Sequence, residues 1–542
     1  MEVQSRHIRG LLVLVFIWTA YFIHSWPAFY ESNQYIRLHQ AEALVDFGSV
    51  HIDDAMARYG VRNEDLSLFK GKSYCDKAIG HPLFGTLAYA VLSAVLPEIP
   101  ADQWIYLLTF FVNMIPHILG VFALIRSAAI LGFSAEASLA VGAVYGLLAP
   151  SLLYASLFFG HQLAATSALV AFWLILESGS SNRAWWSGKS WALLLAGFCT
   201  SQTVAVEYSA LWVGVCLSLY MLRVGSSARA VILFVLGALP WTFGVLLHNW
   251  FVFEHPLHTG YHYKFDGAGL TIEKFENTLF GFRLPDFQDY ARQLFFPTRG
   301  LFFWSPVLLL AIPGLYRMLK SASHRLPGQL CGLIVFGHIT LIAAFVDWTA
   351  GYTAAPRTLV VMLPFLCLTL APVIDGDDLL SRVLRQWLFI PLALVSALHL
   401  VFVSATFPFH APVFSNPIYE LSLPFFLEGF LARNWGGILL GLEGVASMIP
   451  LALATVAILV SLIRAQAIRL PHGHGVVHYV SWIALAFFLM LGAIMVDPPE
   501  PSRAVSKTSA DILSVMDFPD DAARYRDAAR RLPVSNPGAQ PK

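Results

Sequence analysis

Long apolar stretches alternate with polar loops along almost the whole chain. A helix needs roughly 20 apolar residues to cross the hydrocarbon of a membrane, and about thirteen stretches approach that length. We place them at residues 10–26, 103–125, 135–153, a stretch that ends near 176, 191–206, 209–222, 228–252, 301–316, 330–346, 358–373, 387–405, 437–463 and 477–496. The pattern predicts an all-α polytopic membrane protein.

The stretch at 81–96 is apolar but too short to span, and Pro97 and Pro100 end it. We predict an interfacial helix there, because a full span would invert the side of every later loop. The expected domains are a transmembrane domain over 1–496 and a polar periplasmic tail over 497–542. Within the first lie outer loops at 27–100, 253–300 and 406–434, and the tail segment 509–531 has the spacing of a short amphipathic helix.

Basic residues mark every second loop. Arg6 and Arg9 precede the first span, and the loops on the same side hold Arg126, Arg183, Lys189, Arg223, Arg317, Lys320, Arg325, Arg382, Arg385, Arg464 and Arg469. Cytoplasmic loops carry an excess of Lys and Arg. We therefore predict a bacterial inner-membrane protein with a cytoplasmic N-terminus and with its reactive residues on the periplasmic face. The first stretch resembles a signal peptide, but no small-residue cleavage site follows, so we expect an uncleaved span.

Composition agrees with this class and excludes others. The chain has 542 residues, of which 57% are hydrophobic and 13% charged, against about 25% charged in soluble domains. The 34 basic and 34 acidic residues balance, so no basic surplus suits a nucleic acid partner. The 5 cysteines show neither a disulfide framework nor metal-ligand spacing. Motifs for ATP, NAD, zinc-protease and serine-hydrolase chemistry are absent from the sequence, which suits a donor that is already activated.

Both ends of the first outer loop carry candidate chemistry. Glu31 lies just after the first span, and Asp76 and Lys77 lie just before the interfacial helix, so the two ends converge at the membrane surface. A carboxylate there can act as a base toward an acceptor hydroxyl or amine. A lysine there can pair with the phosphate of a lipid carrier. The alternative is that Glu31 and Lys77 are plain interface anchors.

This arrangement resembles the GT-C superfamily of integral-membrane glycosyltransferases, in particular protein O-mannosyltransferases and aminoarabinose transferases. The segment DKAIGHPLFG is similar to a family element that opens an interfacial helix: Asp76 matches its acid, Lys77 its lysine, and Pro82-Leu83 part of its Pro-Pro-Leu. Where the family has Asp-Glu on its first-loop helix, this chain has Asn33-Gln34, and an amide cannot serve as a base. The candidate bases are then Asp76, Glu31 and the reserve Asp53, with its neighbour Asp54 also open.

Other outer loops supply candidate substrate-binding and phosphate-binding residues. Arg299 and Arg357 each stand at the outer start of a span, where a helix N-terminus and a guanidinium group both favour an anion; the alternative is snorkelling at the interface. The remaining candidates are His161, Glu207, His258 and Tyr261. His258 and His262 have a zinc-like spacing, but Gly260 separates them and Pro256 precedes them, so we predict no metal site.

The resemblance implies a glycosyltransferase that moves a sugar from a polyprenyl-phosphate-linked donor to a periplasmic glycan, lipid or protein. Direct displacement at the anomeric carbon would use a first-loop carboxylate, with Lys77, Arg299 and Arg357 stabilising the phosphate that leaves. The sequence requires no cofactor, although a divalent cation could assist. The alternatives are a transporter or flippase for a lipid-linked or small anionic substrate, and an inactive scaffold. Few ionisable residues lie within the spans, which argues against transport.

Overall fold

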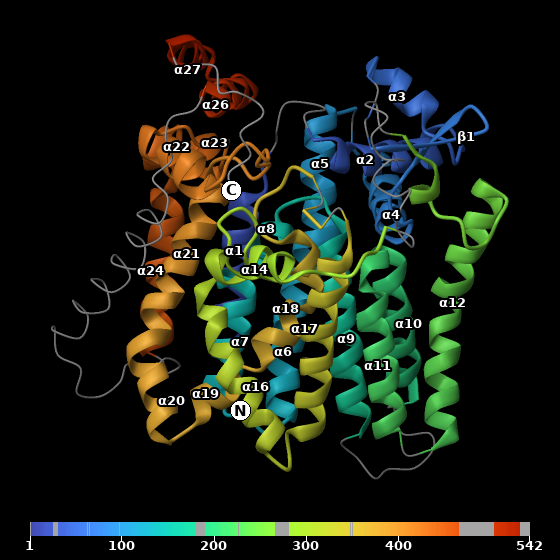
Figure 1. Ribbon diagram of the computed structural model, residues 1–542, viewed down its shortest axis with the longest axis vertical. Helices are drawn as coiled ribbons and strands as arrows, with labels where there is room; N and C mark the ends of the chain where they lie inside the picture. Colours follow the sequence, from blue (N-terminus) through green and yellow to red (C-terminus); the bar gives the residue numbers. More distant parts are fainter. Residues whose placement is uncertain are drawn as a thin grey trace.

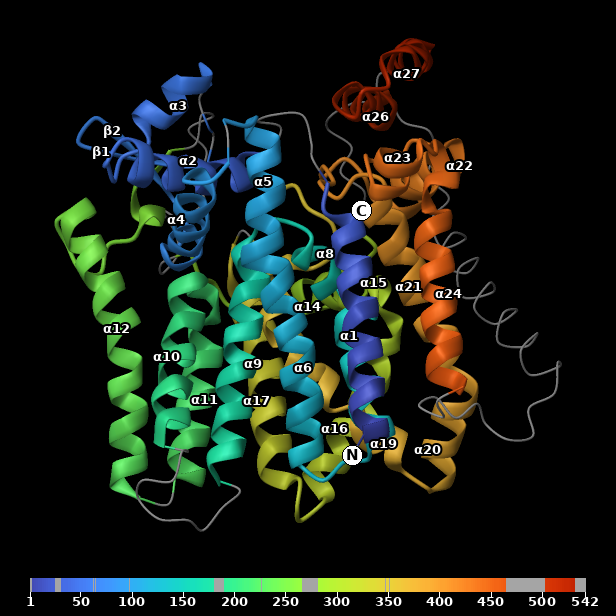
Figure 2. The same ribbon diagram turned by 180° about the vertical axis from the view of Figure 1, so that it is seen from behind.

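The computed structural model is an all-α bundle with one small sheet at the end that carries the first loop, which we name the outer end (Figure 1). It describes residues 2–24, 31–61, 63, 65–96, 98–179, 190–225, 227–265, 281–346, 348–349, 351–464 and 503–531. The N-terminus lies at one end of the bundle, and the helices and strands of the first loop cover the opposite end, as the view from behind also shows (Figure 2). The fold class expected from the sequence is confirmed.

The first half of the bundle is built from long apolar helices. They are α1 (Glu2–Phe22), the continuous α5–η1–α6 (Ala101–Thr109, Phe110–Met114 and Ile115–Ile130), α7–η2 (Ala135–Ala143 and Val144–Leu148), α8 (Ser151–Ala155), α9 (Gly160–Gly179), α10 (Ser190–Val206), η3–α11 (Tyr208–Ala210 and Leu211–Val224) and α12 (Ala228–Phe253). Helix α12 stands at the edge and touches α10 through two glycines. A Cβ atom on Gly197 would lie 1.8 Å from the Phe234 carbonyl oxygen, and one on Gly237 would lie 1.9 Å from that of Leu194.

The second half is more broken. Its elements are α14 (Phe287–Phe295), α15 (Leu301–Trp304), η5–α16 (Pro306–Leu310 and Ala311–Lys320), α17 (Arg325–Ala344), η6–α18 (Arg357–Met362 and Leu363–Leu368), α19 (Ala371–Asp375), α20–η7–α21 (Leu379–Val383, Leu384–Leu388 and Phe389–Ala405), η8–α22 (Ile418–Ser422 and Leu423–Glu428), α23 (Trp435–Leu440) and η9–α24 (Gly444–Met448 and Ile449–Arg464). The stretch expected as one span at 437–463 is interrupted, because Gly441 and Gly444 adopt left-handed φ angles of 64° and 50°.

Five helices in the described part of the chain are long and apolar enough to cross a membrane. They run over Ala101–Ile130, Ala228–Phe253, Arg325–Ala344, Arg357–Asp375 and Leu379–Ala405, and shorter apolar helices run over Ala135–Leu148, Ser190–Val206, Tyr208–Val224 and Gly444–Val460. The count of about thirteen spans stays a prediction. The span expected at 477–496 lies outside the described residues.

The first loop folds into a compact layer on the outer end of the bundle. Helix α2 (Ser32–Asp46) lies across the bundle and is followed by α3 (Asp53–Tyr59), by strands β1 (Leu66–Phe69) and β2 (Lys72–Cys75), and by α4 (Gly80–Ser93) (Figure 1). The two strands form an antiparallel hairpin because Lys70 and Gly71 both take positive φ, as a two-residue hairpin turn requires. Helix α4 has 14 residues and is shorter than a span.

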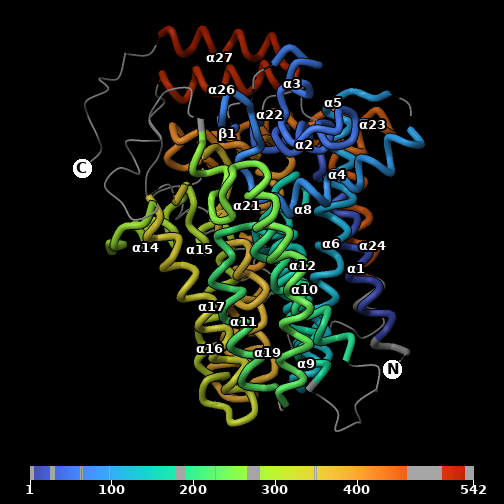
Figure 3. Tube along the Cα trace, turned by 90° about the vertical axis from the view of Figure 1, so that its right-hand side faces the viewer, coloured from blue at the N-terminus to red at the C-terminus, as the bar shows by residue number. Residues whose placement is uncertain are grey.

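Two segments distant in sequence join this outer end. Strand β3 (Lys264–Phe265) pairs with β1 to give the sheet order β2-β1-β3, and the short helix η4 (Gly260–Tyr263) precedes it. The tail segment expected as one amphipathic helix forms two, α26 (Arg503–Val515) and α27 (Pro519–Arg531), which pack side by side (Figure 3). The break falls at Asp517, whose φ is 70°.

Candidate functional site

The N-terminus of α2 holds Glu31 beneath the outer layer. Glu31 is the N-cap residue, and its Oε2 accepts a hydrogen bond of 2.8 Å from the Gln34 amide, which satisfies an amide that a helix start leaves open. Burial raises the pKa of Glu31 to about 7, and the charge of Asp65 acts in the same direction, while Arg357 opposes it. The carboxyl group is therefore suited to accept a proton near neutral pH.

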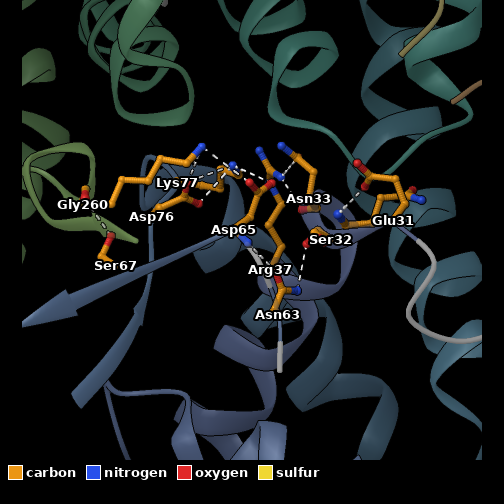
Figure 4. Close-up of polar contacts among 12 residues, drawn as sticks. Glu31, Ser32, Asn33, Arg37, Asn63, Asp65, Ser67, Asp76, Lys77 and Gly260 are labelled. Carbon is orange, nitrogen blue, oxygen red and sulfur yellow. Dashed lines mark hydrogen bonds and ion pairs between the residues drawn. The ribbon is translucent and has the colours of Figure 1, made fainter. Parts of the chain in front are cut away.

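A second group consists of two lysines and two aspartates from the first loop and β3. Figure 4 shows three of its members, Asp65, Asp76 and Lys77. Lys77 Nζ lies 2.9 Å from Asp65 Oδ2 and 3.0 Å from Asp76 Oδ1. Lys264 Nζ lies 3.5 Å from Asp65 Oδ1 and 3.4 Å from Asp76 Oδ2. We call these four residues the acid–lysine cluster. Its two positive and two negative charges balance.

The cluster shifts the proton affinities of its members. Burial alone would lower the pKa of Lys77, but attraction to Asp65 and Asp76 outweighs it and raises that pKa. Burial would raise the pKa of Asp65, but Lys77 and Lys264 hold it well below its usual range. Asp65 and Lys77 are therefore both charged at neutral pH, and Lys77, already paired, offers less charge to a substrate than the sequence suggested.

Two arginines beside this cluster lack such partners. The guanidinium carbon of Arg37 lies 5.9 Å from the ring centre of Phe159, and that of Arg357 lies 5.4 Å from the same centre. Arg37 is 3% exposed; its Nη1 donates 2.6 Å to the Asn33 carbonyl and also bonds the Asn33 side chain. Within the described residues neither arginine forms an ion pair, and the buried Nε of each has no hydrogen-bond partner.

A buried cation without a counter-charge is costly, because burial removes its hydration. Here two cations face one aromatic ring, and cation–π attraction recovers only part of that cost. An anion bound to these guanidinium groups would supply a counter-charge, and phosphate is an anion that guanidinium groups bind through paired hydrogen bonds. We call Arg37, Arg357 and Phe159 the arginine pocket.

His161 and Glu207 form a pair next to Phe159. His161 Nδ1 is 3.3 Å from Glu207 Oε2, and its ring is 6.5 Å from that of Phe159. Burial raises the pKa of Glu207, while Arg37 and Arg357 oppose the shift. The His161–Glu207 pair therefore adds a second group that can exchange a proton near the site. Both residues were candidates in the sequence analysis.

Arg299 has a mainly structural set of contacts. It is buried, and it donates to the backbone carbonyls of Gly351 at 2.8 Å, Thr298 at 3.0 Å and Thr349 at 3.4 Å. These bonds fix the loop that leads to Arg357. Burial, reinforced by the charge of Arg357, lowers the pKa of Arg299 to about 10. Arg299 therefore holds the loop that precedes Arg357 and adds positive charge near the arginine pocket.

Three other predicted residues are placed differently. Asp53 caps the β-hairpin, where it accepts from the Ser73 amide at 3.2 Å, and it makes no contact with the arginine pocket. His258 stacks on His262 and bonds Tyr263 at 2.8 Å, away from the acid–lysine cluster. Tyr261 lies on η4 with its ring 6.4 Å from that of Tyr208 and is half exposed at the edge of the site.

Sequence reasoning missed Arg37, Asp65, Lys264 and Phe159. Arg37 lies in the polar stretch YIRLHQ, whose local pattern gives no sign that residues 33–43 are all buried. Asp65 and Lys264 reach the site only because β1 pairs with β3 across a long sequence separation. The only sequence signals for these two residues are the polar run NED, which ends at Asp65, and the segment KFD, which begins at Lys264. Both are typical of a solvated loop.

No group of three or more metal-ligating side chains is found in the described ranges.

No protein-family model and no curated protein matches the sequence. Among solved structures the chain is similar to ArnT from Cupriavidus metallidurans bound to undecaprenyl phosphate, with 13% identity, a TM-score of 0.49, and coverage of 94% of this chain and 79% of that one. It is also similar to the oligosaccharyltransferase AglB from Archaeoglobus fulgidus in complex with an inhibitory peptide and a dolichol-phosphate, with 11% identity, a TM-score of 0.43, and coverage of 78% and 58%. Both neighbours are members of the GT-C superfamily, the group that the sequence resembles.

Proposed function

We propose that this protein is a glycosyltransferase that moves a sugar from a polyprenyl-phosphate-linked donor to a glycan, lipid or protein acceptor. The observation that carries the proposal is the arginine pocket. Arg37 and Arg357 flank Phe159 without a carboxylate partner among the described residues. Two guanidinium groups of this kind suit the phosphate of a donor, and Glu31 beside them suits an acceptor proton.

The reaction is a displacement at the anomeric carbon. The acceptor hydroxyl oxygen forms the new bond to that carbon, and the bond from the carbon to the phosphate oxygen breaks. The electron pair leaves with the polyprenyl phosphate, whose charge rises from one to two negative units. Arg37 and Arg357 stabilise that developing charge, which lowers the barrier more than it strengthens donor binding.

Glu31 is the proposed base. Its pKa of about 7 lets it be deprotonated before the reaction and still hold the acceptor proton afterwards. Asp76 is a weaker candidate, because it is bound on both sides by lysines. In this proposal Asp76 and Lys77 act as positioning residues that hold the loop layer against η4. In the same proposal, His161 and Glu207 border the space in which the acceptor binds.

The proposed orientation in the membrane rests on where the basic residues lie along the bundle. We propose that the N-terminus is cytoplasmic and that the site faces the periplasm, with residues 1–496 as the transmembrane domain and 497–542 as an outer tail. Helices α16 and α20, which carry Arg317, Lys320 and Arg382, lie at the same end of the bundle as the N-terminus (Figure 1). That distribution matches the positive-inside rule.

The test is turnover of radiolabelled polyprenyl-phosphate sugars by purified protein in nanodiscs. Wild type should release polyprenyl phosphate, and Arg37→Gln and Arg357→Gln should each lose that release. Arg292→Gln is the matched control, because Arg292 is a partly exposed arginine of α14 that bonds Gln288 at 3.1 Å. Movement of an intact lipid across the bilayer without release would instead support a flippase.

A further inference from the structure

A polar groove opens at the far end of α2 from Glu31. Its volume is about 800 Å³, and it is bordered by α2, α3, α4 and the start of α5. The residues that matter for its chemistry are Asp46, Arg58, Tyr59, Tyr89, Ser93 and Trp104. The volume lies in the range of ligand sites, and no residue of the arginine pocket or the acid–lysine cluster borders it.

Hydrogen bonds and ion pairs hold the groove walls in place. Arg58 Nη1 lies 2.7 Å from Asp46 Oδ2 and 3.4 Å from Glu42 Oε1, and the Tyr89 hydroxyl donates 2.8 Å to Asp46. The Tyr59 hydroxyl bonds the fully buried Glu42. Side chains from three separate helices are thus locked before any ligand arrives, which is the preorganisation that a binding site needs.

The groove combines aromatic and polar groups. Tyr59 borders it and is partly exposed, while Tyr89 and Trp104, whose ring centres are 4.5 Å apart, are largely buried in its wall at 4% and 5% exposure. Aromatic rings pack against the C–H faces of sugars, while carboxylate, guanidinium and hydroxyl groups bond their hydroxyls. The groove is thus matched to a ligand with alternating apolar and hydroxyl faces.

The negative charge around the groove limits the kinds of ligand that can bind there. Asp46 and Glu98 border it and Glu42 lies directly behind it, against the single positive charge of Arg58. This excess of negative charge repels polyanionic chains and phospholipid headgroups. A neutral glycan or one that carries amines is the complementary ligand.

The groove and the proposed base lie at the two ends of one helix. Glu31 caps the start of α2, and Asp46 ends it 15 residues later, which is a distance of about 22 Å at the α-helical rise. We propose that the groove is a binding site for the glycan chain of the acceptor, which holds a chain of several neutral or amino sugars while its end reaches Glu31. The inference rests on the proposed transferase function and narrows its acceptor to a glycan.

The first test is glycan binding in the absence of donor, so it stands apart from the transferase proposal. The probes are chitin oligosaccharides of increasing length, their deacetylated amine forms, and hyaluronan fragments as the polyanionic comparison. Wild-type protein in nanodiscs should bind the neutral and amine forms and should not bind hyaluronan. Equal binding of hyaluronan, or no binding of any glycan while a peptide or lipid headgroup binds, would overturn the proposal.

Two variants probe the groove itself. Ser93→Trp fills it from α4, where Ser93 is partly exposed, and Ser93→Ala is its matched control. Glu98→Arg changes the charge at an exposed rim position where it cannot disturb packing. Ser93→Trp should weaken binding of long oligosaccharides about tenfold, a change of roughly 1.4 kcal/mol, and Glu98→Arg should selectively weaken the amine forms.

Kinetics then connect the groove to catalysis. If transferase activity is present, Ser93→Trp should raise KM for a long acceptor and leave kcat and the KM of a single-sugar acceptor unchanged. Only a chain that spans about 22 Å can use both sites, so the effect should depend on acceptor length. A loss that is equal for short and long acceptors would overturn the groove assignment. Absence of transfer together with length-dependent glycan binding would overturn the transferase proposal and leave the glycan site standing.

Discussion

Arg37 and Arg357, which are separated by most of the chain, place their guanidinium carbons 5.9 and 5.4 Å from the centre of one ring, that of Phe159. Helix α2 supplies the first arginine and the start of η6 supplies the second. Like charges near one ring repel, and neither arginine forms an ion pair in the part of the chain that the structure describes, although the charges of Glu31 and Glu207 attract them from a longer distance. The arrangement therefore costs stability in the free protein and is relieved when an anion binds.

The first prediction separates stability from function at Arg37. Arg37→Met keeps an unbranched apolar stem and removes a buried charge that forms no ion pair among the described residues, so the melting temperature should stay the same or rise. Activity should fall roughly 10- to 150-fold, because a hydrogen bond to a charged group contributes about 1.5–3 kcal/mol. Thermal unfolding and donor turnover measured on one preparation check both. A melting temperature that drops by several degrees would show that Arg37 is structural.

The second prediction concerns pH. Glu31 must be deprotonated to act as a base, and its pKa is about 7, so kcat/KM should rise with pH and level off above about 8. Glu31→Gln should abolish this rise together with most of the activity. Glu31→Asp, which keeps the charge on a shorter side chain, should retain a rise at a reduced rate. An unchanged pH profile in the Gln variant would exclude Glu31 as the base.

The raised pKa of Glu31 also predicts how the stability of the folded protein changes with pH. Stability should fall as pH rises, whereas activity should increase. The folded protein holds a proton on Glu31 up to a higher pH than the unfolded chain, whose carboxyl has a pKa near about 4.3. Between that value and about 7 the folded state binds more protons, so its stability falls as pH rises. Glu31→Gln should therefore stabilise the protein more at pH 8 than at pH 5, as measured by thermal unfolding.

The third prediction tests the acid–lysine cluster. Asp65→Asn leaves Lys77 and Lys264 with one aspartate between them, and breaking such a buried pair should cost about 3 kcal/mol. Adding Lys264→Met removes the surplus cation and should recover more than about 1 kcal/mol of that loss. Because the cluster lowers the pKa of Asp65, its contribution is fully present above about pH 4 and is lost as pH falls further. If the stability changes caused by Asp65→Asn and by Lys264→Met simply added in the double variant, the two residues would not be coupled, which would contradict the proposed role of the cluster.

Much of the bundle could be predicted from the sequence, because membrane spans are local signals. The apolar stretch at 103–125 lies within the helix Ala101–Ile130, and that at 228–252 lies within α12. Breaks within spans depend on particular residues, such as the left-handed Gly441, and the average hydropathy of a stretch does not reveal them. Length and composition therefore predict the existence of helices better than their continuity.

The site was predictable only where it lies at span ends. Glu31, Arg299 and Arg357 stand at such ends and Lys77 stands before the interfacial helix, so topology alone brings them to one surface. Arg37 could not be found this way, since residues 33–43 of its helix are all buried, rather than one stripe of them. Asn33 and Gln34 have structural contacts: Gln34 Oε1 accepts from the Phe158 amide at 2.8 Å, and Asn33 accepts from Arg37.

The last prediction concerns Gly260, where η4 meets the β-hairpin. The Gly260 carbonyl accepts 2.7 Å from Ser67 Oγ, and a Cβ atom on Gly260 would lie 2.8 Å from Asp76 Cα and 2.9 Å from both the Asp76 carbonyl oxygen and Ser67 Oγ. Backbone atoms cannot yield as a flexible side chain does, so Gly260→Ala should push η4 away from the hairpin. Lys264, four residues on, would then leave Asp65 and Asp76.

Gly260→Ala should therefore lower activity and make the second outer loop more sensitive to protease, while the transmembrane bundle keeps its helical content. Ser67→Ala removes the hydrogen bond without a clash and should cost only about 1 kcal/mol. Gly244→Ala is the matched control, because a Cβ atom there meets nothing within 4 Å and alanine favours a helix. If Gly260→Ala matched Gly244→Ala in activity and protease resistance, the close contact between η4 and Asp76 would not be what holds the acid–lysine cluster together.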